Sequence, residues 1–322
     1  MLHHDPLIQR RSILAVIGPT GVGKTQFSLR LAEKYPVELI SVDSMLVYKG
    51  FDIGTAKPTQ SELEQVPHHM IDICEPQDHY SVSMYCESVY ECIRSIRRRD
   101  HIPVLVGGSM MYVWALMNGL SQLPSKSSEY RSHLEKEILN MGSAYLWDQL
   151  KVSDPKAASC INPNDHHRLI RALEVIHLTG RPYTDQLGLI KSEGLDLSVM
   201  HCWPNSRSVL YDQINQRFLK MLSQGFIEEV EKLYDEHSSM IRSSIPMRAV
   251  GYRQVSDYLN GAIIYDEMIS KAQQVTRHLA KRQLTWMRKI EGFNAIFDQG
   301  TLSDSLSVMK WVDGMMKVFL SG

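Results

Sequence analysis

The sequence lacks the features that mark several common protein classes. No apolar run approaches the roughly 20 residues that span a membrane, and the nearest stretch, Met110–Met117, is about half that length. The five cysteines are an odd number without a CxxC pair, which argues against a disulfide framework or a zinc site. Net charge is −1, so any nucleic-acid site must be a local basic face. We therefore expect a cytoplasmic, monomeric protein with reduced thiols, no signal peptide and no membrane association.

A phosphate-binding pattern is the first positive feature of the chain. The stretch GPTGVGKT follows the apolar run Ile13–Ile17 and matches G-x-x-x-x-G-K-[ST] between a strand and a helix. It consists of Gly18, Pro19, Thr20, Gly21, Val22, Gly23, Lys24 and Thr25. Glycines let several backbone N–H groups point into one concavity, the lysine supplies a cation, and the Thr25 hydroxyl can join a Mg²⁺ shell. The motif indicates a di- or triphosphate without identifying what carries it.

Short apolar runs alternate with helical patterns in the first third of the chain. We predict strands at Ile13–Ile17, Val37–Val42, His69–Cys74 and Ile102–Val106, with helices at Thr25–Tyr35 and Met84–Arg98. Continuous apolar strands separated by helices are typical of a parallel sheet that is covered on both faces. Ligands of such sheets bind beyond the carboxyl ends of the strands. The phosphate loop, Asp43-Ser44 and Gly107-Gly108-Ser109 should therefore converge.

The pattern changes after Leu120. A linker-like stretch leads into helices from Glu129 to about Gly180, without a strand candidate. The last of these helices should begin at the cap Asn164-Asp165 and end at Thr179-Gly180. A strand at Ser198–Trp203 then precedes helices that run nearly to the end. We predict an α/β fold, a P-loop core with a parallel sheet covered by helices, plus a helical insertion domain. The core takes residues 1–120 and 199–322, and the insertion takes 121–198.

Polar side chains at the strand ends are candidate catalytic groups. Asp43 suits three roles, namely a general base, a Mg²⁺ ligand or a cap of the following turn. Asp72 is either a second metal ligand or a turn residue. Ser109 either lies near the reacting centre or caps the helix that follows it. The residues themselves leave these alternatives open.

Basic segments suggest a nucleic-acid partner. Lys271–Lys289 contains six Lys or Arg and no acidic residue, with Gln283 and Trp286 interleaved. Further cations lie in Arg248–Arg253 and Asp165–Arg168. Such faces can bind a phosphate backbone, and the aromatic ring can stack on an unpaired base. The alternative is an ordinary solvated cationic surface.

With these residues in view, the chain resembles the bacterial tRNA dimethylallyltransferase family. The matching segments are GPTGVGKT, SVDSMLVYKGFDIGTAKP, HHMIDI, VGGSMMYVWALMNGL, NDHHRLIRALEVIHLTGRP, MRAVGYRQ and KRQLTWMRK. The resemblance implies transfer of a dimethylallyl group from dimethylallyl diphosphate to the N6 amine of the adenosine that is 3′ of the anticodon in tRNA. It also implies Thr20–Thr25 as the holder of diphosphate and Mg²⁺, with Thr25 the metal ligand.

The resemblance implies roles for further residues. Asp43 would accept the amine proton, Ser109 would assist near the reacting carbon, and Arg253 would face the diphosphate. Ser109, Leu46 and Ala249 depart from the family's usual Thr, Gln and Cys. The implied tRNA contacts are Asp43, Ser44, Met45, Leu46, Ser109, Arg131, Asn164, Asp165, His166, His167, Arg168, Arg248, Ala249, Val250, Gly251, Tyr252, Arg253, Lys281, Arg282, Gln283, Leu284, Thr285, Trp286, Met287 and Arg288.

Two other functions fit parts of the sequence. A P-loop kinase for a small hydroxyl substrate would share the loop and a strand-end acid, but it does not explain the basic, Trp-bearing segment. A nucleotide-gated RNA-binding protein would explain that segment, but it would give Asp43 and Ser109 no function. A GTPase is disfavoured because the sequence has no N-K-x-D motif for base recognition.

Overall fold

The computed structural model describes residues 12–188, 194–237, 239–298, 301–302 and 305–320. The chain divides into two compact units, Met1–Asn118 together with Gly194–Gly322, and Gly119–Glu193. The second unit ends before the predicted residue 198, since Leu197 and Ser198 already pair with the first strand of the sheet. In the first unit the Leu195 N–H donates to the Leu116 carbonyl at 2.6 Å, so the chain leaves and re-enters this unit at one place.

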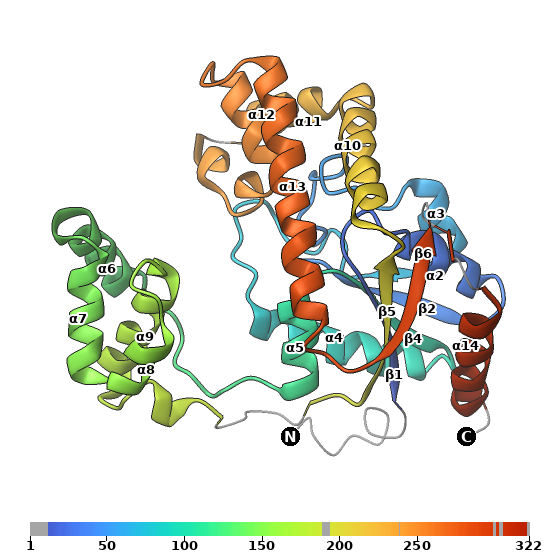
Figure 1. Ribbon diagram of the computed structural model, residues 1–322, viewed down its shortest axis with the longest axis horizontal. Coiled ribbons are helices and arrows are strands. Elements are labelled where there is room, and N and C mark those ends of the chain that lie inside the picture. Colours follow the sequence, from blue (N-terminus) through green and yellow to red (C-terminus); the bar gives the residue numbers. More distant parts are fainter. Residues whose placement is uncertain (1–11, 189–193, 238, 299–300, 303–304, 321–322) are drawn as a thin grey trace. The chain divides into compact units, whose positions relative to one another are not determined.

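A seven-stranded sheet with the order β3-β2-β4-β1-β5-β6-β7 forms the centre of the first unit (Figure 1). The strands are β1 Ile13–Ile17, β2 Val37–Val42, β3 His68–His69, β4 Ile102–Gly107, β5 Leu197–Pro204, β6 Phe293–Asp298 and β7 Thr301–Leu302. All neighbours are parallel except β6 and β7. Every residue of β1 and β2 is buried, as expected for strands covered on both faces, and the predicted α/β class is confirmed.

Helices accompany this sheet. They are α2 Lys24–Ala32, α3 Gln60–Gln65, α4 Val82–Arg97, α5 Met110–Asn118, α10 Arg207–Ser223, α11 Phe226–Glu236, α12 Tyr252–Leu259, α13 Tyr265–Met287 and α14 Ser305–Leu320. A cluster of buried side chains joins the segment after β2 to α10–α13, with Phe51, Phe226 and Tyr252 fully enclosed. Tilted and edge-on contacts among these three rings anchor that segment to the helices. Among the described residues, no helix has the length and apolar character that a membrane span requires.

Two predicted elements differ from the structure. The strand predicted at His69–Cys74 ends after His69, because Met70 and Asp72 adopt left-handed backbone with φ of 66° and 54°. Cys74 makes only an isolated bridge with Tyr48. The end of the chain is also not wholly helical, since β6 extends the sheet beside β5.

The second unit is all-helical among its described residues and has its own core. Its helices are α6 Ser128–Met141, α7 Ser143–Ser153, α8 Pro155–Cys160 and α9 His166–Thr179. As predicted, α9 begins after Asp165, whose carboxylate accepts from the Arg168 N–H, and it ends at Gly180. The buried Glu174 carboxylate accepts hydrogen bonds from Arg131 and Arg171, and these cations hold its pKa near 2 against the effect of burial.

Candidate active site

Three loops meet at the carboxyl edge of the sheet, as predicted. The Gly18 N–H donates to Gly107 O at 3.2 Å, which joins the loops after β1 and β4. The Gly108 N–H donates to Val42 O at 3.1 Å and the Ser44 N–H donates to Ser109 Oγ at 3.2 Å. These bonds place the phosphate loop, the end of β2 and the Gly-Gly turn side by side.

The phosphate loop has the conformation that its glycines allow. Gly21 and Gly23 have φ of 84° and 102°, a region that other residues rarely occupy, and α2 begins at Lys24. The Lys24 ammonium donates to the carbonyls of Gly18 and Pro19 at 3.0 and 2.8 Å. Burial lowers the pKa of Lys24 to about 8. The loop thus encloses a cation next to the start of a helix, which is the arrangement that binds phosphate.

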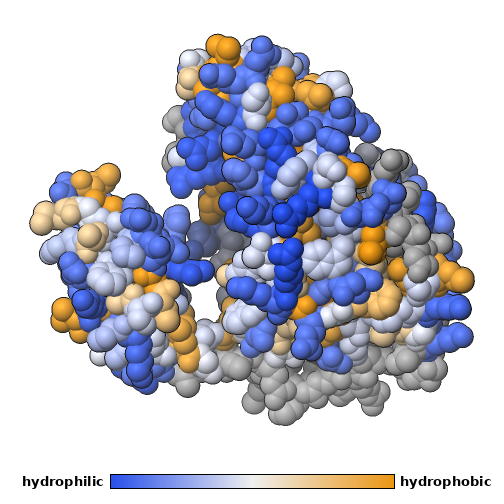
Figure 2. All heavy atoms as spheres, in the orientation of Figure 1, coloured by the Kyte–Doolittle hydropathy of each residue, from blue (hydrophilic) through white to orange (hydrophobic). Residues whose placement is uncertain are grey.

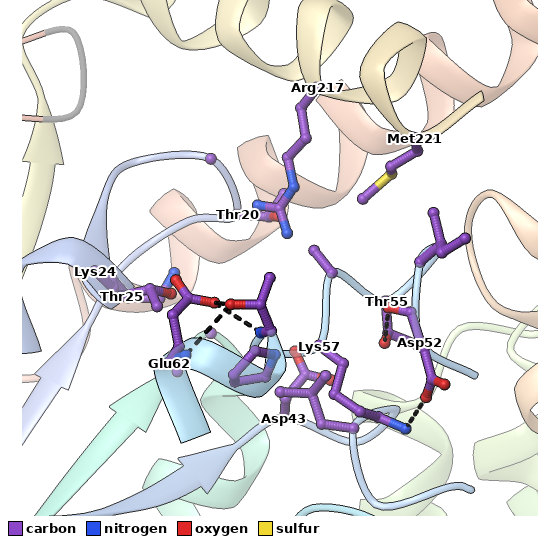
Figure 3. Close-up of a pocket in the computed structure, with 18 of the residues that line it drawn as sticks. Thr20, Lys24, Thr25, Asp43, Asp52, Thr55, Lys57, Glu62, Arg217 and Met221 are labelled. Carbon is purple, nitrogen blue, oxygen red and sulfur yellow. Dashed lines mark hydrogen bonds and ion pairs between the residues drawn. The ribbon is translucent and has the colours of Figure 1, made fainter. Parts of the chain in front are cut away.

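A cavity of about 1110 Å³ opens over this loop. Its wall includes Thr20, Lys24 and Thr25 from the loop, Asp43 from the end of β2, and Arg217 from α10 (Figure 3). Apolar groups such as Leu46, Ile53 and Met221 line other parts of the wall. The space is somewhat larger than most small-molecule sites, so it has room for a substrate larger than one small ligand.

Asp43 combines two properties of a general base. Its side chain lines the cavity, and Oδ1 accepts the Met45 N–H at 2.8 Å, which fixes its orientation. Burial raises its pKa, although the Met45 N–H and the cations of Lys24 and Arg217 oppose the rise. The carboxylate is therefore a better proton acceptor than an exposed aspartate, and it caps the following turn as well.

Arg217 was not predicted from the sequence. It extends from α10 toward the cavity (Figure 3), where burial lowers its pKa and Asp43 opposes that shift. A sequence pattern could have indicated it, since polar residues recur every three or four positions along this helix. These residues, which all line the cavity, are Gln213, Arg217, Lys220 and Gln224. Arg253, the arginine predicted to face the diphosphate, is exposed on α12 and is not among the lining residues. Of these two arginines, Arg217 is the one that lines the cavity.

Asp72, the second acidic candidate for a metal ligand, is already paired with a lysine. Asp72 forms an ion pair with the buried ammonium of Lys57, and Asp52 also pairs with Lys57. The described part of the chain holds no group of three His, Cys, Asp or Glu side chains that could bind a metal ion. Thr25 is exposed at the cavity wall, and a threonine hydroxyl is an oxygen ligand of the kind that Mg²⁺ accepts.

The predicted tRNA-contacting residues fall into exposed and buried groups. In the first unit, the exposed ones are Arg248, Arg253, Lys281, Arg282, Thr285 and Arg288. The buried ones are Gly251, Tyr252, Leu284 and Met287. The partly buried ones are Ser44, Met45, Leu46, Ser109, Ala249, Val250, Gln283 and Trp286. The Tyr252 hydroxyl donates to Glu229, so it stabilises the fold. Figure 2 shows strongly hydrophilic side chains over part of α13. Lys281 and Arg282 on this helix, and Arg288 directly after it, are exposed.

The remaining predicted contacts lie in the second unit. Asn164, His166, His167 and Arg168 are exposed around the start of α9 and, with Asp165, most of them border a shallow pocket. Arg131 already gives its Nε and one terminal nitrogen to Glu174. A tRNA contact by Arg131 would have to use its other N–H groups.

Comparison with known proteins assigns the family. The model of the IPP transferase family matches residues 46–290. The chain belongs to the IPP transferase family. Among curated proteins, a tRNA dimethylallyltransferase of Francisella tularensis is 44% identical over 301 residues, which cover 93% of this chain and 97% of the relative. A tRNA dimethylallyltransferase of Francisella philomiragia is 45% identical over 278 residues, which cover 86% of this chain and 90% of the relative.

Solved structures of IPP transferases share the fold. The tRNA isopentenylpyrophosphate transferase of Bacillus halodurans has a TM-score of 0.67 and 38% identity, over 97% of both chains. A eukaryotic dimethylallyltransferase acting on tRNA has a TM-score of 0.78 and 25% identity, over 97% of this chain and 80% of its own. These similarities extend across both units of the chain.

Proposed function

We propose that this protein transfers a dimethylallyl group from dimethylallyl diphosphate to the N6 amine of the adenosine that is 3′ of the anticodon in tRNA. Membership of the IPP transferase family supports the reaction class. The observation that carries the proposal is the cavity that Asp43 shares with the phosphate loop. It brings a proton acceptor and a diphosphate-binding loop into one space, which alkyl transfer to an amine requires.

The acceptor side of the reaction depends on Asp43. The adenine amine is a weak nucleophile because its lone pair is delocalised into the ring. As the nitrogen forms a bond to C1 of the allyl group, its proton becomes acidic, and the Asp43 carboxylate accepts it. Burial raises the pKa of this carboxyl, which improves it as a base. Ser109, whose Oγ accepts the Ser44 N–H, holds the backbone next to Asp43 in place.

The donor side depends on the loop and on Arg217. As the C1–O bond breaks, its electron pair leaves with the diphosphate, so negative charge grows on the phosphate oxygens. The loop N–H groups, Lys24 and Arg217 stabilise that charge. The Thr25 hydroxyl would hold Mg²⁺, which when bound neutralises part of the diphosphate charge.

The nucleic-acid substrate would bind to the exposed basic residues. Arg282 and Arg288 on α13 and Arg248 and Arg253 around the start of α12 present cations that can bind phosphates. The target adenosine must leave its stack to enter the cavity. The volume of the cavity, about 1110 Å³, is compatible with a prenyl diphosphate and an extruded base together.

The direct test combines the purified protein with Mg²⁺, dimethylallyl diphosphate and unmodified tRNA. Mass spectrometry of the digested tRNA is expected to show adenosine that has gained one dimethylallyl group. Omission of the donor is the control. Unmodified adenosine with intact donor recovered would refute the proposal, whereas consumption of ATP in a separate assay with a hydroxyl substrate would favour a kinase.

A further inference from the structure

Gln283 uses its side chain inside the unit rather than on its surface. From α13 its Oε1 accepts the Thr20 N–H at 2.9 Å, and its Nε2 donates to Gly108 O at 3.0 Å. The residue is partly buried and lines the cavity, whereas its neighbours Lys281 and Arg282 are exposed. The carboxamide thus links the loop that follows β1 to the loop that follows β4.

In the phosphate loop, Gln283 and Lys24 hold two ends of the same peptide group. The carbonyl of the Pro19–Thr20 peptide accepts from the Lys24 ammonium at 2.8 Å, and its N–H donates to Gln283. A phosphate bound in the loop would compete with the Pro19 carbonyl for the lysine, because a charged oxygen accepts a stronger hydrogen bond. Gln283 remains as the side chain that fixes the orientation of this peptide group.

The second loop repeats this arrangement. In the Gly108–Ser109 peptide the carbonyl accepts from Gln283, and the N–H donates to Val42 O at 3.0 Å. Gly108 has no space for a side chain, since a Cβ atom there would lie 2.5 Å from Gln283 Nε2 and 2.9 Å from Gly18 O. The glycine therefore allows the amide to approach, and the amide fixes the peptide that precedes Ser109.

We propose that Gln283 is a positioning residue for the diphosphate donor, holding the Pro19–Thr20 and Gly108–Ser109 peptides in the orientation that forms the phosphate site. This inference rests on the proposed function for the identity of the donor. It differs from the sequence-based interpretation, in which Gln283 contacts tRNA. Lys281 and Arg282, next to it on α13, are exposed. In this proposal the charged residues of this helix segment bind tRNA, and the amide of Gln283 orients the loops that bind the donor.

The test compares Gln283→Met with Gln273→Met. Methionine retains the length of glutamine and removes both hydrogen bonds. Gln273 is the matched control, because it lies on the same helix, is also partly buried, and bonds through its amide to a backbone carbonyl, Asn215 O, outside the cavity. Calorimetry with inorganic diphosphate and Mg²⁺ measures donor-site affinity, fluorescence anisotropy measures tRNA affinity without donor, and steady-state kinetics gives KM and kcat.

Gln283→Met is expected to raise the diphosphate Kd and the KM for the donor by about tenfold, because fewer molecules hold the loop in its binding form. Its tRNA Kd should stay within about twofold of the wild-type value, and Gln273→Met should change neither. Unchanged diphosphate affinity in Gln283→Met would refute the proposal. So would weaker tRNA binding with a normal donor KM, which would make Gln283 a tRNA contact.

Gln283→Glu keeps the inference testable if the methionine variant does not fold. The carboxylate can still accept the Thr20 N–H but repels Gly108 O and the diphosphate, so donor affinity should again fall while tRNA affinity does not. Wild-type affinity in this variant would contradict the positioning role. Because inorganic diphosphate binding needs no prenyl transfer, a wild-type protein that binds diphosphate without modifying tRNA would refute the proposed function and leave this inference standing.

Discussion

Replacement of Asp43 by asparagine is the sharpest test of the proposed chemistry. The substitution is nearly isosteric, and an amide oxygen can still accept the Met45 N–H that Oδ1 accepts at 2.8 Å. The turn after β2 should therefore keep its shape, and tRNA affinity should stay near the wild-type value. The amide cannot take a proton from the adenine amine. A lost general base lowers the chemical step by about 10²–10⁴-fold, which corresponds to about 2.7–5.4 kcal/mol of transition-state stabilisation.

Single-turnover kinetics with saturating donor and tRNA measures this step without product release. In the wild type the active form is the carboxylate, so the rate should fall as pH drops through the pKa of Asp43. Burial raises that pKa above 3.8, so the fall should begin at a higher pH than for an exposed aspartate. The variant should lose this dependence. Asp52→Asn is the control, since it removes the same charge from an exposed aspartate that also lines the cavity. A rate for Asp43→Asn within about threefold of wild type, together with weakened tRNA binding, would make Asp43 a contact or a cap.

Three further predictions concern cations. Arg217→Gln should raise the donor KM by about tenfold or more, because a charge-assisted contact to diphosphate is lost; an unchanged KM in steady-state assays would contradict this placement. Arg282→Gln should weaken tRNA binding and reduce the slope of log affinity against log salt by about one, whereas Lys271→Gln, which lies elsewhere on α13 and is paired with Glu267, should leave the slope nearly unchanged. Inorganic diphosphate affinity should fall as pH rises above about 8, since the lowered pKa of Lys24 lets it lose its proton there; calorimetry across that range should show no such fall in Lys24→Met.

The parts of the fold that the sequence predicted are those with strong local patterns. The bounds of β1 and β2 agree residue for residue, because fully buried strands give continuous apolar runs between turn residues. The start and end of α9 follow from a capping carboxylate and a glycine. In each case the residues that decide the structure are neighbours in the chain.

The parts that the sequence did not predict depend on distant contacts. Phe293–Asp298 is a strand because it pairs with β5, about ninety residues earlier in the chain. The alternation of apolar and polar residues over so short a segment does not distinguish a strand from the end of a helix. The strand predicted at His69–Cys74 is interrupted by left-handed backbone at Met70 and Asp72, and Asp72 forms an ion pair with Lys57. Arg217 reaches the site only through the packing of α10 in the fold.

The hydrogen bond between Leu195 and Leu116 has a consequence for how such a protein can change over evolution. Because the two ends of the sheet-containing unit meet at 2.6 Å, the intervening residues Gly119–Glu193 form a cassette that is entered and left at a single point. A cassette with its own core can be lengthened, shortened or exchanged while the strand order and the catalytic cavity remain intact. The helical unit can therefore differ between lineages while the cavity over the phosphate loop keeps its residues.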